Sequence, residues 1–220
     1  MNLLCRVAPQ AGLLAAAPEG VAWLSSTEQA RHASFASAAR RETFVAGRWL
    51  AREAVRQWRG GDRLPVLAVA ASGACEVIDE PGVCVSISHA GGHVACAVAA
   101  VPVGVDVETT QKPRDALALA RTVHGAAQIR ELEALPPEAR LQRFLQWWTL
   151  KEAWLKARGR GLDFALMRSL AFDDEPSGDA AVCTLGDRVV AVVTQAVLPP
   201  VHGLPDATWQ RLQSRQVPAG

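Results

Sequence analysis

The sequence predicts an α+β fold made of two similar lobes in one chain. Three observations support this: a helical pattern precedes a group of short apolar runs, this order occurs twice, and Pro102 separates two β-rich stretches. A chain of 220 residues also suits two small lobes that share a core. We therefore expect an N-terminal lobe of residues 1–102 and a C-terminal lobe of residues 103–220.

The first half is expected to open with a strand and loop over residues 1–24 and to continue as one helix over residues 25–58. Ser26 or Thr27 is positioned to cap this helix, and apolar side chains recur at the spacing of a buried helical face. A Gly-Gly-Asp turn ends the helix. The strands expected after it span residues 64–70, 75–78, 83–88 and 94–101.

The second half is expected to begin with a strand over residues 103–108, directly after the proline break. Helical periodicity follows over residues 115–135, with an interruption near Gly125, and resumes over residues 138–157 after a Pro-Pro pair. Glycines then end this second helix. Further strands are expected at 170–172, 181–185 and 189–197, and the Pro- and Gly-containing end of the chain is expected to be loose.

Composition narrows the class of protein. Half of the residues are hydrophobic and 20% are charged, which is the balance of an ordinary globular protein. The formal net charge of +1 provides no global field for nucleic acid or an anionic membrane, so neither is expected as a partner. The five cysteines are scattered without a CxxC pair, and no apolar run suits a signal peptide or a membrane span. We expect a cytoplasmic protein with free thiols.

The motif GVDVE, residues 104–108, places two carboxylates on one face of a strand. Asp106 and Glu108 project together, whereas Val105 and Val107 face the other way into a core. Paired carboxylates repel each other unless a cation lies between them, and hard oxygen ligands favour Mg²⁺. An edge strand with a solvated acidic face is the alternative interpretation.

The stretch WWTLKEAWLKARGRGL, residues 147–162, adds charged groups to a helix rich in tryptophan. Trp148, Glu152 and Lys156 follow at i, i+4 and i+8, so they share one face. Glu152 is suited to be a third oxygen ligand or a general base, and Lys156 to hold a phosphate or protonate a leaving group. The alternative is an exposed Glu–Lys pair worth about 0.3–0.5 kcal/mol, but Trp148 on the same face argues against full exposure.

Two further features suit phosphate binding. In SISHAGGH, residues 86–93, Ser88 and His89 end a strand before a Gly-Gly turn, although a turn-capping Ser beside an ordinary His is also possible. A Ser-His hydrolase is disfavoured because adjacent strand residues point to opposite faces. The first helical region carries an arginine row that either faces solvent or supplies bidentate phosphate contacts. Its members are Arg31, Arg40, Arg41, Arg48 and Arg52.

The order SxSHxxG, GVDVE and WWTLKEAWLKxxGxGL closely resembles the surfactin-synthetase-type 4′-phosphopantetheinyl transferases over about residues 28–162. The resemblance implies two similar α+β lobes related by a pseudo-two-fold axis, with the active site between them. It also implies Mg²⁺-dependent transfer of the 4′-phosphopantetheine arm of coenzyme A to a serine of an acyl or peptidyl carrier protein, with release of adenosine 3′,5′-bisphosphate.

The resemblance also assigns roles to residues. Asp106, Glu108 and Glu152 are expected to hold Mg²⁺, and Glu152 to accept the serine proton directly or through a metal-bound water. Lys156 is expected to neutralise the pyrophosphate and act with Glu152 in catalysis. The residues expected at coenzyme A are Arg31, Arg48, Ser88, His89 and Lys156.

The sequence departs from the family pattern at three positions. Ala74 stands where a basic residue is usual, Glu28 lies near a position that is basic in some members, and Gln128 replaces a common Glu. The missing cation at Ala74 implies weaker coenzyme A binding or a substitute arginine. Lys151 lies on a different helical face from Glu152 and receives no role.

Two other functions stay open from the sequence. One is a relative that binds coenzyme A or a carrier protein without turnover, and the other is a Mg²⁺-dependent phosphohydrolase acting on nucleotides. The resemblance favours a monomeric enzyme of secondary metabolism, and the sequence does not name the carrier protein.

Overall fold

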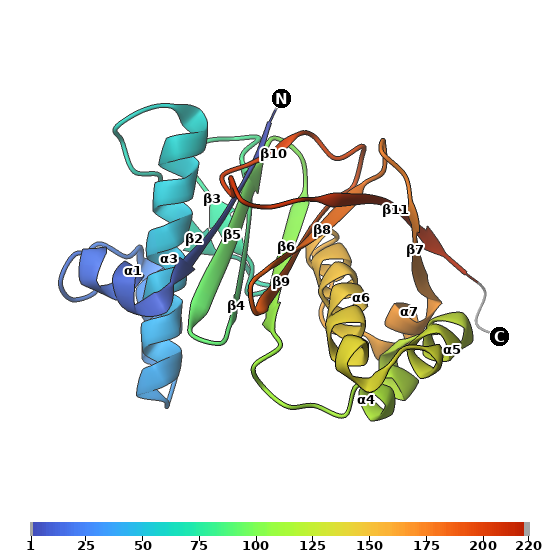
Figure 1. The fold of residues 1–220 in the computed structure, drawn as a ribbon. Coiled ribbons are helices and arrows are strands. Elements are labelled where there is room, and N and C mark those ends of the chain that lie inside the picture. Colours follow the sequence, from blue (N-terminus) through green and yellow to red (C-terminus); the bar gives the residue numbers. More distant parts are fainter. Residues whose placement is uncertain (1, 218–220) are drawn as a thin grey trace.

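Two β-sheets lie face to face between two long helices (Figure 1). The structure, a computed structural model, describes residues 2–217. Helix α3 (Ala38–Arg59) covers the outer side of one sheet, and helix α6 (Pro137–Ala157) covers the outer side of the other. The predicted α+β fold with two lobes is confirmed, because each lobe lays one helix of more than 20 residues across a sheet. The division of the chain after residue 102 stays a prediction.

The first sheet has the strand order β10-β1-β5-β4, and the second has the order β6-β9-β8-β11-β7. All neighbours in these sheets are antiparallel except β1 and β10, which are parallel. The elements of the first half are β1 (Leu3–Pro9), α1 (Gln10–Ala16), α2 (Ser26–Ala33), α3, β2 (Leu67–Val69), β3 (Cys75–Val77), β4 (Cys84–Ala90) and β5 (His93–Ala99). The elements of the second half are β6 (Val103–Thr109), α4 (Ala116–Val123), α5 (Ala126–Ala134), α6, α7 (Phe164–Ser169), β7 (Leu170–Asp174), β8 (Ala180–Leu185), β9 (Arg188–Thr194), β10 (Val201–His202) and β11 (Gln210–Gln216).

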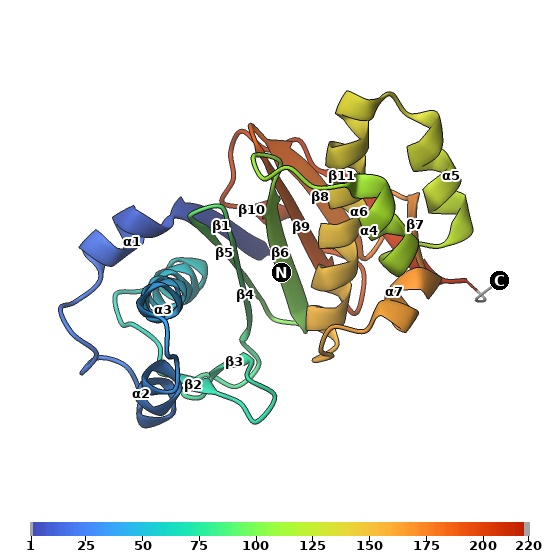
Figure 2. The same ribbon diagram turned by 90° about the horizontal axis from the view of Figure 1, so that it is seen from below.

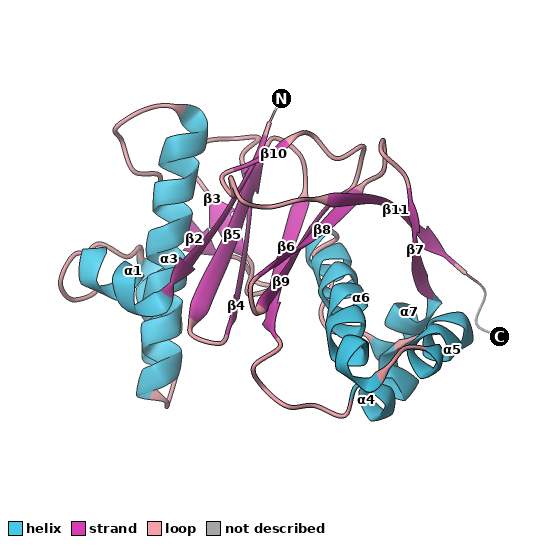
Figure 3. Ribbon diagram, in the orientation of Figure 1, coloured by secondary structure: helices cyan, strands magenta, loops and turns pink. Residues whose placement is uncertain are grey.

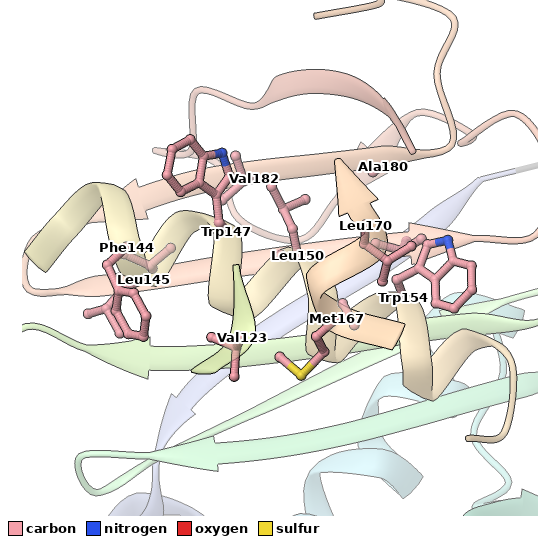
Figure 4. Packing of buried hydrophobic residues seen from close by; sticks show 14 of the residues in the cluster. Val123, Phe144, Leu145, Trp147, Leu150, Trp154, Met167, Leu170, Ala180 and Val182 are labelled. Atoms are coloured by element: carbon pink, nitrogen blue, oxygen red, sulfur yellow. The ribbon is translucent and has the colours of Figure 1, made fainter. Parts of the chain in front are cut away.

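Three hydrophobic clusters fill the three spaces between these layers. Beneath α6, Phe144, Trp147, Leu150 and Trp154 pack against the second sheet and against Met167 of α7 (Figure 4). Seen from below, α4, α5 and α7 gather beside α6 and enlarge this cluster (Figure 2). Trp147 and Trp154 are buried in this cluster, and the partly buried Trp148 packs against it.

The predicted single helix over residues 25–58 is wrong, because the chain forms α2 and α3 with a break between them. Ser34 ends α2, and its hydroxyl donates a hydrogen bond to the Arg31 carbonyl at 2.7 Å, which competes with helical bonding. The cap is Ser25 rather than Ser26 or Thr27. Its side chain accepts from the Glu28 N–H, and the Glu28 carboxylate accepts from the Ser25 N–H at 2.8 Å, so the pair forms a capping box.

Four elements were not predicted: the short helices α1 and α7, and strands β10 and β11 in the tail that was expected to be loose (Figure 3). Strand β11 reads QRLQSRQ, so it lacks the apolar alternation of a strand, and only Leu212 reaches the core. It is held instead by pairing with β7 and β8 on either side. The predicted interruption near Gly125 is confirmed as the boundary between α4 and α5.

Candidate active site

The two sheets meet where edge strand β4 lies against edge strand β6. Each edge strand leaves backbone groups that its own sheet cannot satisfy. The Val105 N–H donates to the Ser86 hydroxyl at 3.1 Å, and the Val105 carbonyl accepts from Lys156 Nζ at 3.1 Å. Side chains from both lobes therefore close the junction, and they bring β4, β6 and α6 to one place.

Gly104 allows α6 to lie directly on β6. A Cβ at this position would be 1.9 Å from the Ala153 carbonyl oxygen and 2.6 Å from the Ala157 nitrogen, both in the backbone of α6. Because residues two apart in a strand share a face, Asp106 and Glu108 point to the same side as Gly104. The close approach thus sets Glu152 and Lys156 of α6 beside the two strand carboxylates.

Asp106 is the centre of this arrangement and is 3% exposed. Its Oδ1 accepts from the Ser88 hydroxyl at 2.6 Å and from Lys156 Nζ at 2.7 Å, whereas its Oδ2 is buried without a partner among the described residues. Val105 and Val107 lie in the core between the sheets, as the alternation of GVDVE predicts. The alternative interpretation of this motif, an edge strand with a solvated acidic face, is therefore wrong for Asp106.

Glu108 and Glu152 complete a group of three carboxylates from two elements. Glu108 accepts a hydrogen bond from the Arg114 guanidinium at 2.6 Å. Glu152 lies 4.0 Å from Lys156 Nζ, which is its shortest ion pair within the described part of the chain. Burial, reinforced by the nearby negative charge of Asp106, raises the pKa of Glu152 to about 7. We call Ser88, Asp106, Glu108, Glu152 and Lys156 the carboxylate seam.

The carboxylate seam has the donor set that a hard cation requires. An unpartnered, buried carboxylate oxygen and a carboxyl group whose pKa is raised both indicate negative charge in excess of its protein partners. Within residues 2–217, however, no three His, Cys, Asp or Glu side chains are arranged so that they could hold a metal ion as they stand. Glu108 is turned to Arg114 and Asp106 to Lys156, so these two cations balance two of the three carboxylates.

A cavity of about 720 Å³ adjoins the carboxylate seam and is lined by both lobes. Its lining includes basic side chains and no Asp or Glu, so it is suited to a ligand with several negative charges. The basic lining residues are Arg31, Arg40, Arg48, His89, Lys156 and Arg160. We call this space the cationic cavity. Lys156 belongs to both regions and joins them.

The adjacent residues Ser88 and His89 serve the two regions separately, because they point to opposite sides of β4. Ser88 is buried and donates to Asp106, and it also accepts from Lys156 Nζ at 3.1 Å. His89 lines the cationic cavity, where desolvation by the cavity walls and the charge of Lys156 lower its pKa. A direct Ser-His pair is thus excluded by the strand geometry.

The predicted coenzyme A residues Arg31 and Arg48 both line the cationic cavity. Arg48 is 5% exposed and lies 3.7 Å from the Glu28 carboxylate, which Arg52 also binds at 2.6 Å. Glu28, one of the departures from the family pattern, therefore anchors these two arginines. Arg31 has its guanidinium carbon 4.8 Å from the ring centre of Phe35 and forms no ion pair within residues 2–217.

Lys151, whose role could not be predicted from the sequence, is completely buried between α6 and the α4–α5 corner. Its Nζ donates to the Val123 carbonyl at 3.0 Å and to Gln128 Oε1 at 2.8 Å, and it forms a third hydrogen bond with His124 Nδ1 at 2.9 Å. Burial lowers the pKa of Lys151 to about 7, and burial together with Lys151 lowers the pKa of His124 to about 3. The cluster ties α6 to the helices beside it without any carboxylate.

Sequence reasoning missed two arginines that the structure places in these regions. Arg114 binds Glu108, and Arg160 lines the cationic cavity beyond the end of α6. Arg40 was named only as a member of the arginine row, and it also faces this cavity. An isolated arginine in a loop has no periodic pattern to mark it, so its position between Gly159 and Gly161 was the only available signal for Arg160.

Comparison with known protein families agrees with this geometry. Residues 102–199 match a family described as the 4'-phosphopantetheinyl transferase superfamily, and residues 28–99 match the 4'-phosphopantetheinyl transferase N-terminal domain. The two matches adjoin each other and together cover most of the chain. The β4–β6 junction lies where the two matched regions meet.

Individual relatives carry the same description. The chain is 31% identical over 146 residues to the 4'-phosphopantetheinyl transferase HetI of Nostoc sp., which covers 64% of this chain and 62% of HetI. It is 37% identical over 81 residues to psf-1 of Bacillus pumilus, covering 37% of this chain and 34% of psf-1. It is 33% identical over 88 residues to Sfp of Bacillus subtilis, covering 40% of this chain and 38% of Sfp. The chain thus spans less than two thirds of each of these relatives.

Proposed function

The chain belongs to the 4′-phosphopantetheinyl transferase superfamily, and on this premise we propose that it transfers the 4′-phosphopantetheine arm of coenzyme A to a serine of a carrier protein. The observation that carries the proposal is the junction at Lys156 between the cationic cavity and the carboxylate seam. Coenzyme A has a charged nucleotide part and a reactive pyrophosphate. A cavity without acidic lining suits the nucleotide, and the adjoining carboxylates suit a cation bound to the pyrophosphate.

In the proposed reaction the serine oxygen attacks the phosphorus that bears the pantetheine arm. A new P–O bond forms, the bond to the bridging oxygen of the pyrophosphate breaks, and adenosine 3′,5′-bisphosphate leaves with that oxygen. Mg²⁺ bound by Asp106, Glu108 and Glu152 would supply positive charge at the pyrophosphate. Arg31, Arg48, Ser88 and His89 are proposed to contact coenzyme A at its phosphates.

Lys156 is proposed to stabilise the charge that develops on the leaving pyrophosphate oxygens. Its Nζ now donates to Ser88, Val105 and Asp106, so all three of its hydrogens have partners. A phosphate contact therefore requires exchange of one of these bonds. The positive charge acts on the pyrophosphate before and after such an exchange, because Lys156 is held at the mouth between the two regions.

Glu152 is proposed as the general base that takes the serine proton. Burial places its pKa at about 7, which is close to the value that suits proton transfer at neutral pH. A cation held beside it lowers this pKa, so that the carboxylate is ionised at neutral pH when the substrate complex has formed. The negative charge of the Glu152 carboxylate would also bind the cation. The roles of general base and cation ligand together account for a partly buried glutamate on this face of α6.

Incubation of an apo carrier protein with the full chain, coenzyme A and Mg²⁺ tests the proposal, with intact-protein mass spectrometry as the readout. We expect the carrier to gain the mass of one phosphopantetheine arm, and a carrier whose acceptor serine is replaced by alanine to gain none. Coenzyme A binding without added mass on any carrier would favour the non-catalytic relative. Release of a nucleotide product without a carrier would favour the phosphohydrolase.

The partners and setting of the protein are part of the same proposal. We infer a monomer that acts in the cytoplasm on an acyl or peptidyl carrier protein, with no role for nucleic acid or a membrane. None of the helices in residues 2–217 combines the length and the apolar composition that crossing a bilayer requires. A panel of apo carrier proteins from fatty-acid, polyketide and nonribosomal-peptide systems would identify the preferred acceptor.

A further inference from the structure

The cationic cavity lacks a cation on one wall. The turn between β2 and β3, residues 72–75, lines the cavity with Ser72, Gly73, Ala74 and Cys75, none of which carries positive charge. A nucleotide bound here needs a charge for each of its phosphate groups, because an unpaired phosphate loses hydration without compensation. A cation from another element that reaches the same space can take its place.

The end of α6 brings Arg160 to this cavity in a fixed backbone geometry. The Gly159 N–H donates to the Lys156 carbonyl at 3.0 Å, and the Arg160 N–H donates to the Leu155 carbonyl at 2.9 Å. Together with the left-handed φ of 62° at Gly159, these bonds form a Schellman motif. Arg160 is therefore held at a constant position relative to Lys156, one turn beyond it.

The side chain of Arg160 is unusual for its place in this motif. The second residue after the cap commonly makes an apolar contact with the last helical turn, yet here it is an exposed arginine. Its guanidinium forms no hydrogen bond or ion pair within residues 2–217, whereas the nearby Arg158 stacks on Trp154 and lies 3.8 Å from the Asp179 carboxylate. The free guanidinium lines the cationic cavity.

The order of groups along α6 indicates which phosphate Arg160 would meet. Glu152 lies at the carboxylate seam, Lys156 binds Asp106 at the junction, and Arg160 follows at the end of the helix away from the carboxylates. The pyrophosphate belongs at the junction, next to the carboxylates. A cation farther along the same wall is therefore available to the remaining phosphate of coenzyme A, the 3′-phosphate of its ribose.

We propose that Arg160 binds the 3′-phosphate of coenzyme A and supplies the cation that Ala74 does not. The inference rests on the proposed function and assigns a specificity-determining residue within it. Arg31 and Arg40 line the same cavity from the N-terminal lobe, so the 3′-phosphate lies between cations of both lobes. Bidentate contact by a guanidinium would favour coenzyme A over dephospho-coenzyme A, which lacks this phosphate.

Isothermal titration calorimetry in Mg²⁺ buffer tests the proposal with coenzyme A and dephospho-coenzyme A as separate ligands. For Arg160→Ala we expect the Kd for coenzyme A to rise about tenfold, the usual loss of a charge-assisted contact. The Kd for dephospho-coenzyme A should stay within about twofold, since it offers this side chain no phosphate. Arg130→Ala is the matched control, because Arg130 is an exposed arginine outside the cavity.

A second variant tests whether Arg160 replaces the missing cation. Adding Ala74→Lys to Arg160→Ala should recover most of the preference for coenzyme A over dephospho-coenzyme A. If Arg160→Ala weakens both ligands equally, or neither, the assignment of Arg160 is overturned while the proposed function stands. If the wild-type chain binds neither ligand, the proposed function fails together with the assignment.

Discussion

The carboxylate seam and the cationic cavity are neighbours that are built in opposite ways. In the seam, Asp106 is 3% exposed and its contacts to Ser88 and Lys156 are 2.6 and 2.7 Å long. In the cavity, Arg31 and Arg160 have no acidic partner within residues 2–217 and face open space. A closed network loses much when one member is removed, because the rest stay buried without partners. When one of the exposed cations of the cavity is removed, only its contacts with a bound ligand are lost.

Stability and ligand binding therefore depend on different groups of side chains. The seam is part of the fold, since Ser88 and Lys156 both bind Asp106 and Lys156 also closes the junction between the sheets. The cavity is a surface that the fold leaves free for a ligand. Substitutions in the seam should therefore change folding or the chemical step, and substitutions in the cavity should change affinity. Three predictions test this separation and one tests the buried Lys151 cluster, in order of decreasing effect.

The largest effect is expected for Gly104→Ala, which would destroy the seam. The added Cβ would be 1.9 Å from the Ala153 carbonyl oxygen, so α6 must move away from β6. We expect the free energy of unfolding to fall by about 3 kcal/mol or more, and the melting temperature to fall by about 6–12 °C. Circular dichroism melting curves measure this shift.

Gly12→Ala is the matched control for that variant. Gly12 lies in α1, and a Cβ there would meet nothing within 4 Å. Its replacement should leave the melting temperature unchanged or raise it slightly, because alanine favours helices over glycine by about 1 kcal/mol. Equal melting temperatures for Gly104→Ala and the wild type would show that α6 does not need this close approach.

The second prediction concerns the chemistry of the seam. Asp106→Asn and Glu152→Gln keep the shape of each side chain and remove one negative charge. We expect each to lower the rate of transfer by about 100-fold or more, because the pyrophosphate would lose charge stabilisation. Each should also weaken Mg²⁺ binding in calorimetric titrations. Chelation of Mg²⁺ by EDTA should stop transfer by the wild-type protein.

Glu138→Gln controls for loss of a carboxylate on the same helix. Glu138 is exposed in the first turn of α6, far along the helix from the seam. We expect wild-type transfer and Mg²⁺ binding for this variant. A near wild-type rate for Asp106→Asn at ordinary Mg²⁺ concentration would remove Asp106 from the set of ligands.

Sequence patterns predicted the seam better than the cavity, for a physical reason. Alternation in β6 and the i, i+4 spacing of α6 fix which way Asp106 and Glu152 point, so their meeting follows once the two elements touch. The close contact itself depends on Gly104, whose role is visible only when α6 is in place. No periodic pattern marks Arg114 and Arg160, and both belong to loops.

The same reason explains the errors in the fold. The break between α2 and α3 depends on the Ser34 hydroxyl and not on a change of apolar periodicity. Strand β11 has a polar sequence and owes its structure to the strands on both sides. The secondary structure of such segments depends on their tertiary contacts, which cannot be read from a single sequence.

The third prediction tests the buried cluster that ties α6 to α4 and α5. Burial lowers the pKa of Lys151 to about 7, while the unfolded chain keeps the ordinary value near 10.5. Between these values the unfolded chain binds a proton that the folded chain does not, so stability should rise with pH. The slope should approach about 1.4 kcal/mol per pH unit above pH 7.5.

Urea unfolding of the wild type and Lys151→Met at pH 6.5, 7.5 and 8.5 measures this slope. The difference between the two proteins isolates Lys151, because the buried cysteines and other groups titrate in both. We expect the free energy of unfolding of Lys151→Met to depend less on pH than that of the wild type. The transfer rate of this variant should keep the wild-type pH profile. Parallel stability curves would show that Lys151 is charged in the folded protein at neutral pH.

The smallest effect is expected for Arg31→Ala in the cationic cavity. Arg31 lies over the Phe35 ring and forms no ion pair with the other described residues, so the melting temperature should not change. A charge at a phosphate remote from the reaction binds the ground and transition states almost equally. We therefore expect the KM for coenzyme A to rise about three- to tenfold while kcat stays within about twofold.

The double variant Arg31→Ala with Arg160→Ala tests whether both arginines, one from each lobe, bind the same phosphate group of coenzyme A. If both guanidinium groups contact the 3′-phosphate, the second substitution removes less affinity than it does alone, because the phosphate has already lost part of its fixed position. Calorimetry with coenzyme A should then show a combined loss smaller than the sum of the single losses, and dephospho-coenzyme A should show almost none. Strictly additive losses would place Arg31 at a different phosphate from Arg160, and the cavity would then bind the nucleotide at two separate points.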